Sequence, residues 1–187
     1  MMENKVDIFC NDYPQNSIFY ALAGILATVE SNFGKREPSY TILGIELCNQ
    51  GPQLFFPYNI EKGIIIWITE DCRFDIVQAV YQVAHEVVHC LRPTLFGEST
   101  YLEEGLATYF AHQYTNQHYG AIGTSDPKYK KASDLAQRLL EYKPSIIKEL
   151  RISEPSMSLF TKEMILSHCP DMEELAIKLT TNFQIEL

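Results

Sequence analysis

Apolar side chains in the first third of the chain recur every three or four positions, at Ile18, Leu22, Ile25 and Val29. This spacing places them on one face of a helix, so we predict a helix over residues 17–33 that ends at Gly34. The turn-forming segment 13–17 precedes this helix and can cap it. The apolar run 6–10 predicts a short strand before that turn.

The pattern then changes to three runs rich in β-forming residues, at positions 40–48, 53–58 and 63–69. Polar turn segments separate the three runs. Pro57 cannot donate to a sheet ladder, which predicts an edge or a break in the second strand. Residues 64–68 show no polar alternation, so we expect the third strand to be covered on both faces.

Helical spacing returns after the third strand, at Val77, Val80, Ala84, Val87, Val88 and Leu91. Asp71 can cap the start of this helix, and Pro93 stops it. Residues 102–110 resemble the first turns of another helix. The order of elements so far is therefore a helix, a sheet and two further helices.

The last third of the chain is more charged and predominantly helical in pattern. Asp126 opens a helix that runs to about residue 142, Pro144 opens another, and the segment 171–174 opens the last. We predict one α+β domain, with a small mixed or mainly antiparallel sheet packed on the helix around residue 85. Its parts are a helix and sheet, two central helices and a helical end, at residues 1–70, 71–119 and 120–187.

The sequence His85-Glu86-Val87-Val88-His89 lies within the first of the two central helices. Residues four apart stack on one helix face, so His85 and His89 can direct two imidazole nitrogens at one metal ion. Glu86 lies about 100° around the helix from His85, where it can contact a metal-bound water without ligating the metal. This is the HExxH arrangement of zinc metallopeptidases.

Two histidines do not complete a catalytic zinc site, which takes three protein ligands and leaves one position to water. Glu103 and Glu104 follow His89 at the start of the next predicted helix. They are about 100° apart on that helix, so one of them at most reaches the metal. Helical periodicity does not choose between the two glutamates.

The segment from Asp71 to Tyr114 resembles the gluzincin group of zincin metallopeptidases, in which a second helix supplies a glutamate ligand. The segment Glu104-Gly105-Leu106-Ala107-Thr108-Tyr109 is similar to the corresponding segment of the M1 aminopeptidase branch. This resemblance implies that Glu104 is the third ligand. The chain has Glu103 where that branch usually has Asn, and its spacer is shorter. The resemblance therefore implies a zincin-like fold, one Zn²⁺ per chain and peptide hydrolysis, but not aminopeptidase specificity.

In such a mechanism Glu86 is the general base that activates a zinc-bound water, and a further side chain stabilises the oxyanion of the transition state. The resemblance also implies that a sheet edge holds the peptide or protein substrate as an added strand. Periodicity does not identify that edge. Candidates for the oxyanion donor, or for a residue that supports the ligands, are Thr108, Tyr109, His112, Tyr114, His118 and Tyr119.

Composition narrows the range of partners. Fifteen Lys and Arg against 24 Asp and Glu give a net charge of -9, which argues against a nucleic-acid partner. The five cysteines are scattered without a CxxC pair, as is typical of a reducing compartment. No signal-peptide pattern and no apolar run long enough for a membrane span are present. We therefore expect a cytoplasmic protein without a membrane partner, whose oligomeric state the sequence leaves open.

Two alternatives to a gluzincin peptidase remain. The first is a zinc-binding regulatory or interaction protein whose hydrolase activity is latent or lost. The second is a deformylase-like hydrolase, in which an upstream cysteine, here Cys48, would take the place of Glu104 as the third ligand. Small buried Cys90 is expected to be a core residue rather than a ligand.

Overall fold

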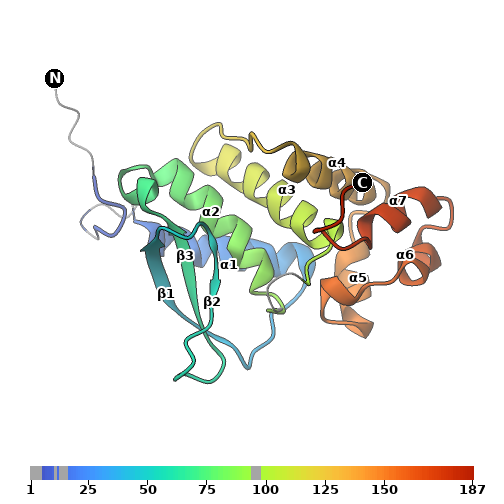
Figure 1. The fold of residues 1–187 in the computed structure, drawn as a ribbon, viewed down its shortest axis with the longest axis horizontal. Helices are drawn as coiled ribbons and strands as arrows, with labels where there is room; N and C mark the ends of the chain where they lie inside the picture. The colour runs from blue at the N-terminus through green and yellow to red at the C-terminus, as the bar shows by residue number, and fades with distance from the viewer. Residues whose placement is uncertain (1–5, 11, 13–16, 94–97) are drawn as a thin grey trace.

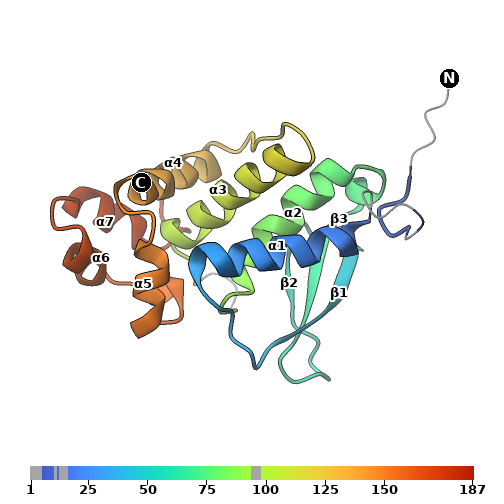
Figure 2. The ribbon, with the colours of Figure 1, turned by 180° about the vertical axis from the view of Figure 1, so that it is seen from behind.

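The structure is a computed structural model that describes residues 6–10, 12, 17–93 and 98–187. A small sheet lies beside a group of packed helices (Figures 1 and 2), which confirms the predicted α+β class. The first half contains α1 (Ile18–Phe33), β1 (Thr41–Cys48), β2 (Gln53–Phe55), β3 (Gly63–Thr69), the 3₁₀ helix η2 (Glu70–Phe74) and α2 (Ile76–His89). The second half contains α3 (Tyr101–His118), α4 (Pro127–Tyr142), α5 (Ile146–Ser153), the 3₁₀ helix η3 (Met157–Leu159), α6 (Lys162–His168) and α7 (Glu173–Leu179).

Helix α1 begins and ends where the sequence predicts. Ser17 is its N-cap, and Gly34 follows its last residue with a φ of 94°, a conformation that residues with a Cβ rarely adopt. Its buried face contains Ile18, Ile25 and Val29, which are at most 1% exposed. Seen from behind, the helix crosses in front of α2 and the end of the sheet (Figure 2), and its apolar face forms part of the core.

The sheet is mixed, with β3 between parallel β1 and antiparallel β2. One face of β3 is fully buried, and Ile65 and Trp67 on the other face are partly buried, so both faces are covered but the outer one less completely than predicted. The outer face is covered locally by side chains of the sheet itself, since the Trp67 ring stacks on Phe55 at 4.1 Å between centroids. Strand β2 ends at Phe55, in agreement with the break expected near Pro57.

The predicted strand at 6–10 is wrong, because these residues form a turn. The Asp7 side chain accepts a hydrogen bond from the backbone N–H of Phe9 at 3.0 Å, and the Asp7 carbonyl accepts one from Cys10 at 2.9 Å. An aspartate that binds the nearby backbone in this way favours a turn over a strand. The predicted turn at 13–17 lies outside the described residues except for Ser17.

Helix α2 starts later than predicted, and Asp71 does not cap it. The segment that contains Asp71 forms η2, and Asp75 is the N-cap, with its carboxylate accepting from the N–H of Gln78 at 3.0 Å. Gln82 then joins α2 to the end of β3. Its amide oxygen accepts from Thr69 N, and its amide nitrogen donates to Thr69 Oγ1, both at 2.8 Å. These contacts fix the rotation of α2, and therefore which residues face the core.

The C-terminal part is helical, as predicted. Asp126 caps α4 through the N–H of Lys128 at 2.8 Å, and α5 and α7 begin close to their predicted starts. The sequence pattern did not predict helix α6. Helix α3 lies between α2 and α4 (Figure 1), so it is held from both sides. Within the part of the chain that is described, no helix has the length and apolar character to cross a membrane.

Candidate metal centre

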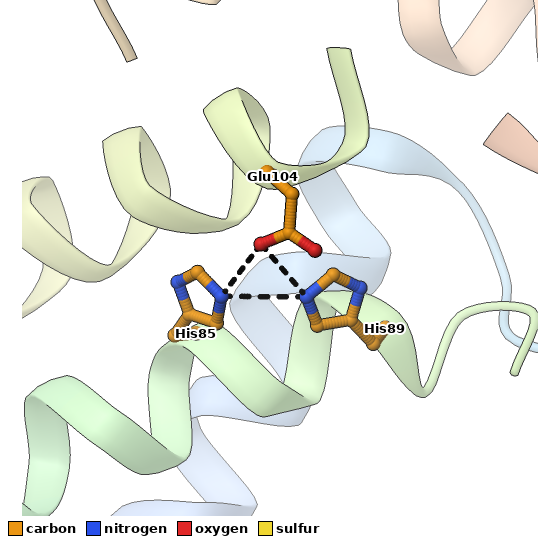
Figure 3. Close-up of side chains that lie close together, drawn as sticks. All are labelled: His85, His89 and Glu104. Atoms are coloured by element: carbon orange, nitrogen blue, oxygen red, sulfur yellow. Dashed lines mark hydrogen bonds and ion pairs between the residues drawn. The ribbon is translucent and has the colours of Figure 1, made fainter. Parts of the chain in front are cut away.

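Three potential ligands meet where α2 and α3 pack together. His85 and His89 point from one face of α2 towards Glu104, which lies in the first turn of α3 (Figure 3). The two histidine Nε2 atoms are 3.3 Å apart. Glu104 Oε2 lies 3.3 Å from Nε2 of His85 and 3.8 Å from Nε2 of His89. These three residues form a group that could hold a metal ion.

The local sequence explains why Glu104 reaches this point. Thr100 is the N-cap of α3, and its hydroxyl accepts from the backbone N–H of Glu103 at 3.4 Å. This cap fixes where the helix starts and therefore the direction of each residue in its first turn. Acidic side chains in a first turn also interact favourably with the helix dipole.

The triangle of donor atoms has the dimensions of a tetrahedral site. Zinc binds histidine nitrogen and carboxylate oxygen at about 2.0–2.2 Å, so tetrahedral ligands are roughly 3.3–3.6 Å apart. The three separations of 3.3, 3.3 and 3.8 Å fall at or close to that range. A small shift of the Glu104 carboxylate would bring all three within it.

Glu103 makes a different contact from Glu104, and the group that could hold a metal ion includes Glu104 and not Glu103. Its Oε1 accepts a hydrogen bond from Nδ1 of His89 at 3.0 Å, and the side chain is 1% exposed. When such a histidine is neutral and donates from Nδ1, it carries its lone pair on Nε2, the atom that faces Glu104. Glu103 therefore orients His89 and sets its tautomer, a role that the sequence analysis did not assign to it.

The buried charges in this group perturb one another. Burial disfavours the charge of His89, but the carboxylates of Glu104 and Glu103 outweigh burial and raise its pKa. Burial likewise acts to raise the pKa of Glu104, but the nearby His89 and His85 outweigh it and lower that pKa. The group therefore favours ionised Glu104, which is the form that binds a metal.

Glu86 follows His85 on α2 and is 5% exposed. Burial raises the pKa of its carboxyl group, although His85 and His89 act in the opposite direction. A buried carboxylate with a raised pKa beside potential metal ligands is suited to accept and release a proton. A bound cation would oppose this shift and favour the ionised carboxylate.

The ligand group opens into a cavity of about 510 Å³. The edge strand β2 supplies Gln53 and Leu54 to one wall of this cavity, and α4 supplies Lys128 and Tyr129. The other residues that line it are Pro52, Phe56, His85, Glu86, His89, Ser99, Glu104, Phe183 and Gln184. A sheet edge and the ligand group therefore share one pocket.

The structure places the six candidate donors away from this lining. Thr108 is fully buried within the core, and His112 accepts a hydrogen bond from the N–H of Thr124 at 2.9 Å. The ring of Tyr114 packs against His118, with centroids 4.6 Å apart. The residues that line the cavity do not include any member of the set Thr108, Tyr109, His112, Tyr114, His118 and Tyr119.

Tyr129 is the tyrosine that lines the cavity, and the sequence analysis missed it. Its ring centroid lies 5.8 Å from that of His85, at 67° between the planes. Burial raises the pKa of its hydroxyl group, and the carboxylates of Glu104 and Glu86 add to the effect. The hydroxyl therefore stays protonated and remains a hydrogen-bond donor.

Gly105 allows α4 to bring Tyr129 this close. A Cβ atom at Gly105 would lie 2.2 Å from the carbonyl oxygen of Ala132 and 3.0 Å from Cβ of Ala136, both on α4. Real Cβ atoms do not approach backbone oxygen so closely, so the packing of α3 on α4 requires a glycine here. The sequence does contain a signal for this close packing: Gly105 on one helix, and Ala132 and Ala136, four residues apart, on the next.

The cysteines do not join the ligand group. Cys48 lies at the end of β1, where its Sγ accepts from the N–H of Gln50 at 3.3 Å, and it is not part of the ligand group that contains Glu104. Cys90 is 1% exposed in the core, which confirms the expectation of a core residue. Burial raises the pKa of its thiol, so it stays neutral.

Comparison of the chain with protein-family models, with curated proteins and with solved structures gave no match. A functional assignment therefore rests on the geometry and the charges of the site.

Proposed function

We propose that the protein is a zinc-dependent peptidase of the gluzincin type. The observation that carries this proposal is the near-tetrahedral triangle of His85, His89 and Glu104, with buried Glu86 beside it in an open cavity. Three protein ligands leave a fourth position free, as catalytic zinc sites do and closed structural sites do not. The cavity provides space for a substrate next to that position.

The donor set fits zinc, since some catalytic zinc sites are built from two histidines and a glutamate. Calcium and magnesium prefer six or more oxygen ligands, whereas two imidazole nitrogens and one carboxylate favour zinc and its neighbours in the periodic table. The hydrogen bond from His89 to Glu103 also supports a metal, because histidine ligands commonly donate their second nitrogen to a carboxylate. When bound, zinc would polarise the scissile carbonyl and acidify a water molecule.

Two side chains of the protein carry out the remaining steps, which are proton transfer and stabilisation of the oxyanion. Glu86 accepts the proton of the attacking water and passes it to the leaving amine. The Tyr129 hydroxyl donates a hydrogen bond to the oxygen on which negative charge develops. Tyr129 takes this role in preference to the six candidates from the sequence because it lines the cavity and they do not.

Strand β2 would hold the substrate. It is an edge strand of the described sheet, and Gln53 and Leu54 line the cavity next to the ligand group. An edge strand offers unpaired backbone groups to an extended peptide whatever its sequence. The substrate is accordingly a peptide or an extended segment of a protein.

The first test is the metal content of protein purified without a chelator or a histidine tag, before and after zinc is added and dialysed away. We expect about one zinc per chain. A Glu104→Ala variant should retain zinc weakly, and equal affinity in this variant and the wild type would remove Glu104 from the site. No retained zinc in the wild type would refute the metal centre.

The second test separates a peptidase from a zinc protein without hydrolase activity. A Glu86→Gln variant should retain zinc but lose cleavage of a peptide library that the wild type hydrolyses. Failure of the zinc-loaded wild type to cleave any member of a broad library would favour the regulatory or interaction protein. Cleavage that persists in Glu86→Gln would remove the assigned general base.

A further inference from the structure

Lys128 lines the cavity next to Tyr129, at a position where a lysine does not stabilise its own helix. It is the one lysine or arginine among the described residues that line the cavity. It lies in the first turn of α4, where the helix dipole disfavours a positive charge. Helix stability therefore does not account for a lysine at this position.

The Lys128 ammonium group is held against a fixed aromatic ring. Its Nζ atom lies 4.8 Å from the centroid of Phe183, a cation–π distance. The backbone N–H of Phe183 donates to the carbonyl of Ser99 at 2.8 Å, and its ring packs against Tyr101 and Tyr129 at 5.0 Å each. Phe183 is 6% exposed, so the ring is a rigid support.

This ammonium group lacks an acidic partner in the described part of the chain, where no carboxylate lies within the 4.0 Å that defines an ion pair. Lys143 and Lys178, by contrast, pair with Glu149 and Glu174. An unpaired ammonium group on the wall of a pocket attracts an anion, and the anion that a peptide carries is a carboxylate.

We propose that Lys128 binds a carboxylate of the peptide substrate close to the scissile bond. The inference rests on the proposed peptidase function and adds a substrate class to it. A cavity of about 510 Å³ is roughly 10 Å across, which about three residues of an extended peptide span. The carboxylate therefore belongs to one of the few residues nearest the cleaved bond. It is either the C-terminal carboxylate of the peptide or an Asp or Glu side chain.

Binding is measured by titration calorimetry with three peptide probes. The protein is the zinc-loaded Glu86→Gln variant, in which the probes are expected to bind without being cleaved. These are N-acetyl-trialanine with a free carboxylate, the same peptide as its amide, and N-acetyl-Ala-Ala-Asp amide. We expect the free acid or the aspartyl peptide to bind about 10-fold more tightly than the trialanine amide. Whichever of these two peptides binds more tightly than the trialanine amide identifies the source of the carboxylate.

The assignment to Lys128 comes from a second substitution in the same background. Lys128→Met should reduce the preference for the carboxylate to less than about 2-fold, and Lys128→Arg should keep part of it. Lys130→Met is the matched control, because it removes the same charge from an exposed position on α4 outside the cavity. A preference that survives in Lys128→Met would show that the metal alone binds the carboxylate, and would overturn the proposal.

Kinetics separate this inference from the peptidase assignment. With Glu86 intact, Lys128→Met should raise KM for the carboxylate-bearing peptide about 10-fold with little change in kcat, because the contact is equal in ground and transition states. An unchanged KM together with normal cleavage overturns the Lys128 subsite but leaves the peptidase. A Lys128-dependent preference without cleavage by the wild type supports the subsite and refutes the peptidase.

Discussion

Substitution of Gly105 by alanine tests the proposed link between helix packing and the position of Tyr129 in the proposed active site. The added Cβ would lie 2.2 Å from the carbonyl oxygen and 2.7 Å from the carbonyl carbon of Ala132. Ordinary van der Waals contact begins at 3.4 Å, so the two helices must separate by 3.4 minus 2.2, or about 1.2 Å, at this point. Neither clashing atom can rotate away, because both belong to the backbone of α4.

Helix α4 is the element that must move. Helix α3 is held on its other side by α2, where Glu103 of α3 binds His89 of α2. Tyr129 lies three residues before Ala132, about one helical turn, so it moves with the displaced segment. The metal ligands lie on α2 and α3 and should keep their positions.

The expected signature is a large loss of rate with a small loss of stability. A misplacement of about 1 Å costs roughly 10²-fold in rate. Overpacking lowers the free energy of unfolding by about 1–3 kcal/mol. The higher helix propensity of alanine relative to glycine raises it by about 1 kcal/mol. The net loss in the free energy of unfolding is therefore about 0–2 kcal/mol, and zinc affinity is unchanged.

The assay combines kcat/KM on a peptide that the wild type cleaves, urea unfolding and zinc competition with a chelator. Gly44→Ala in β1 is the matched control, since a Cβ there meets no atom within 4 Å. Wild-type kcat/KM in Gly105→Ala would refute the argument that this contact positions Tyr129. A loss of zinc affinity that accounts for the lost rate would refute the argument that α4, not α3, moves.

Two further predictions concern other buried groups. Glu103→Ala should weaken zinc binding about 10- to 100-fold, because His89 loses the carboxylate that orients it, and Glu103→Gln should fall between this variant and the wild type. A chelator competition that finds equal affinity in all three proteins would contradict the role of Glu103. Arg151 donates to the carbonyls of Phe33, Gly34, Lys35, Leu91 and Pro155. Arg151→Met should reduce the free energy of unfolding in urea by about 3–5 kcal/mol, since buried carbonyls lose a charged donor, and a loss below about 1 kcal/mol would contradict this reasoning.

The ligand group could be predicted from the sequence because its geometry is local. A four-residue spacing on one helix fixes the relation of His85 to His89 wherever that helix lies. Glu104 is also close along the chain, with fourteen residues between it and His89, so a short connection brings the two helices together. The helix over 17–33 was predictable for the same reason, since its spacing and its terminal glycine are local signals.

Tyr129 and Lys128 could not be placed in the same way, because their positions depend on how α4 packs on α3. That packing is decided by the fit of Gly105 against Ala132, a contact between two different helices that no spacing along one helix reveals. The strand predicted at 6–10 failed for a different reason. Its apolar composition fits a strand, but Asp7 forms hydrogen bonds with the backbone that follows it, and this local contact prevails.

The charges of the site also support the proposed metal centre. Glu86, Glu103 and Glu104 are each at most 8% exposed, and two histidines are the basic groups of the ligand cluster. Burial raises the pKa of Glu86, and the other two carboxylates raise that of His89, so protons partly offset this negative charge. A divalent cation offsets it more fully while both histidines remain neutral ligands. Binding of the proposed metal would release protons and stabilise the packing of α2 on α3, which would couple the stability of the fold to the metal centre.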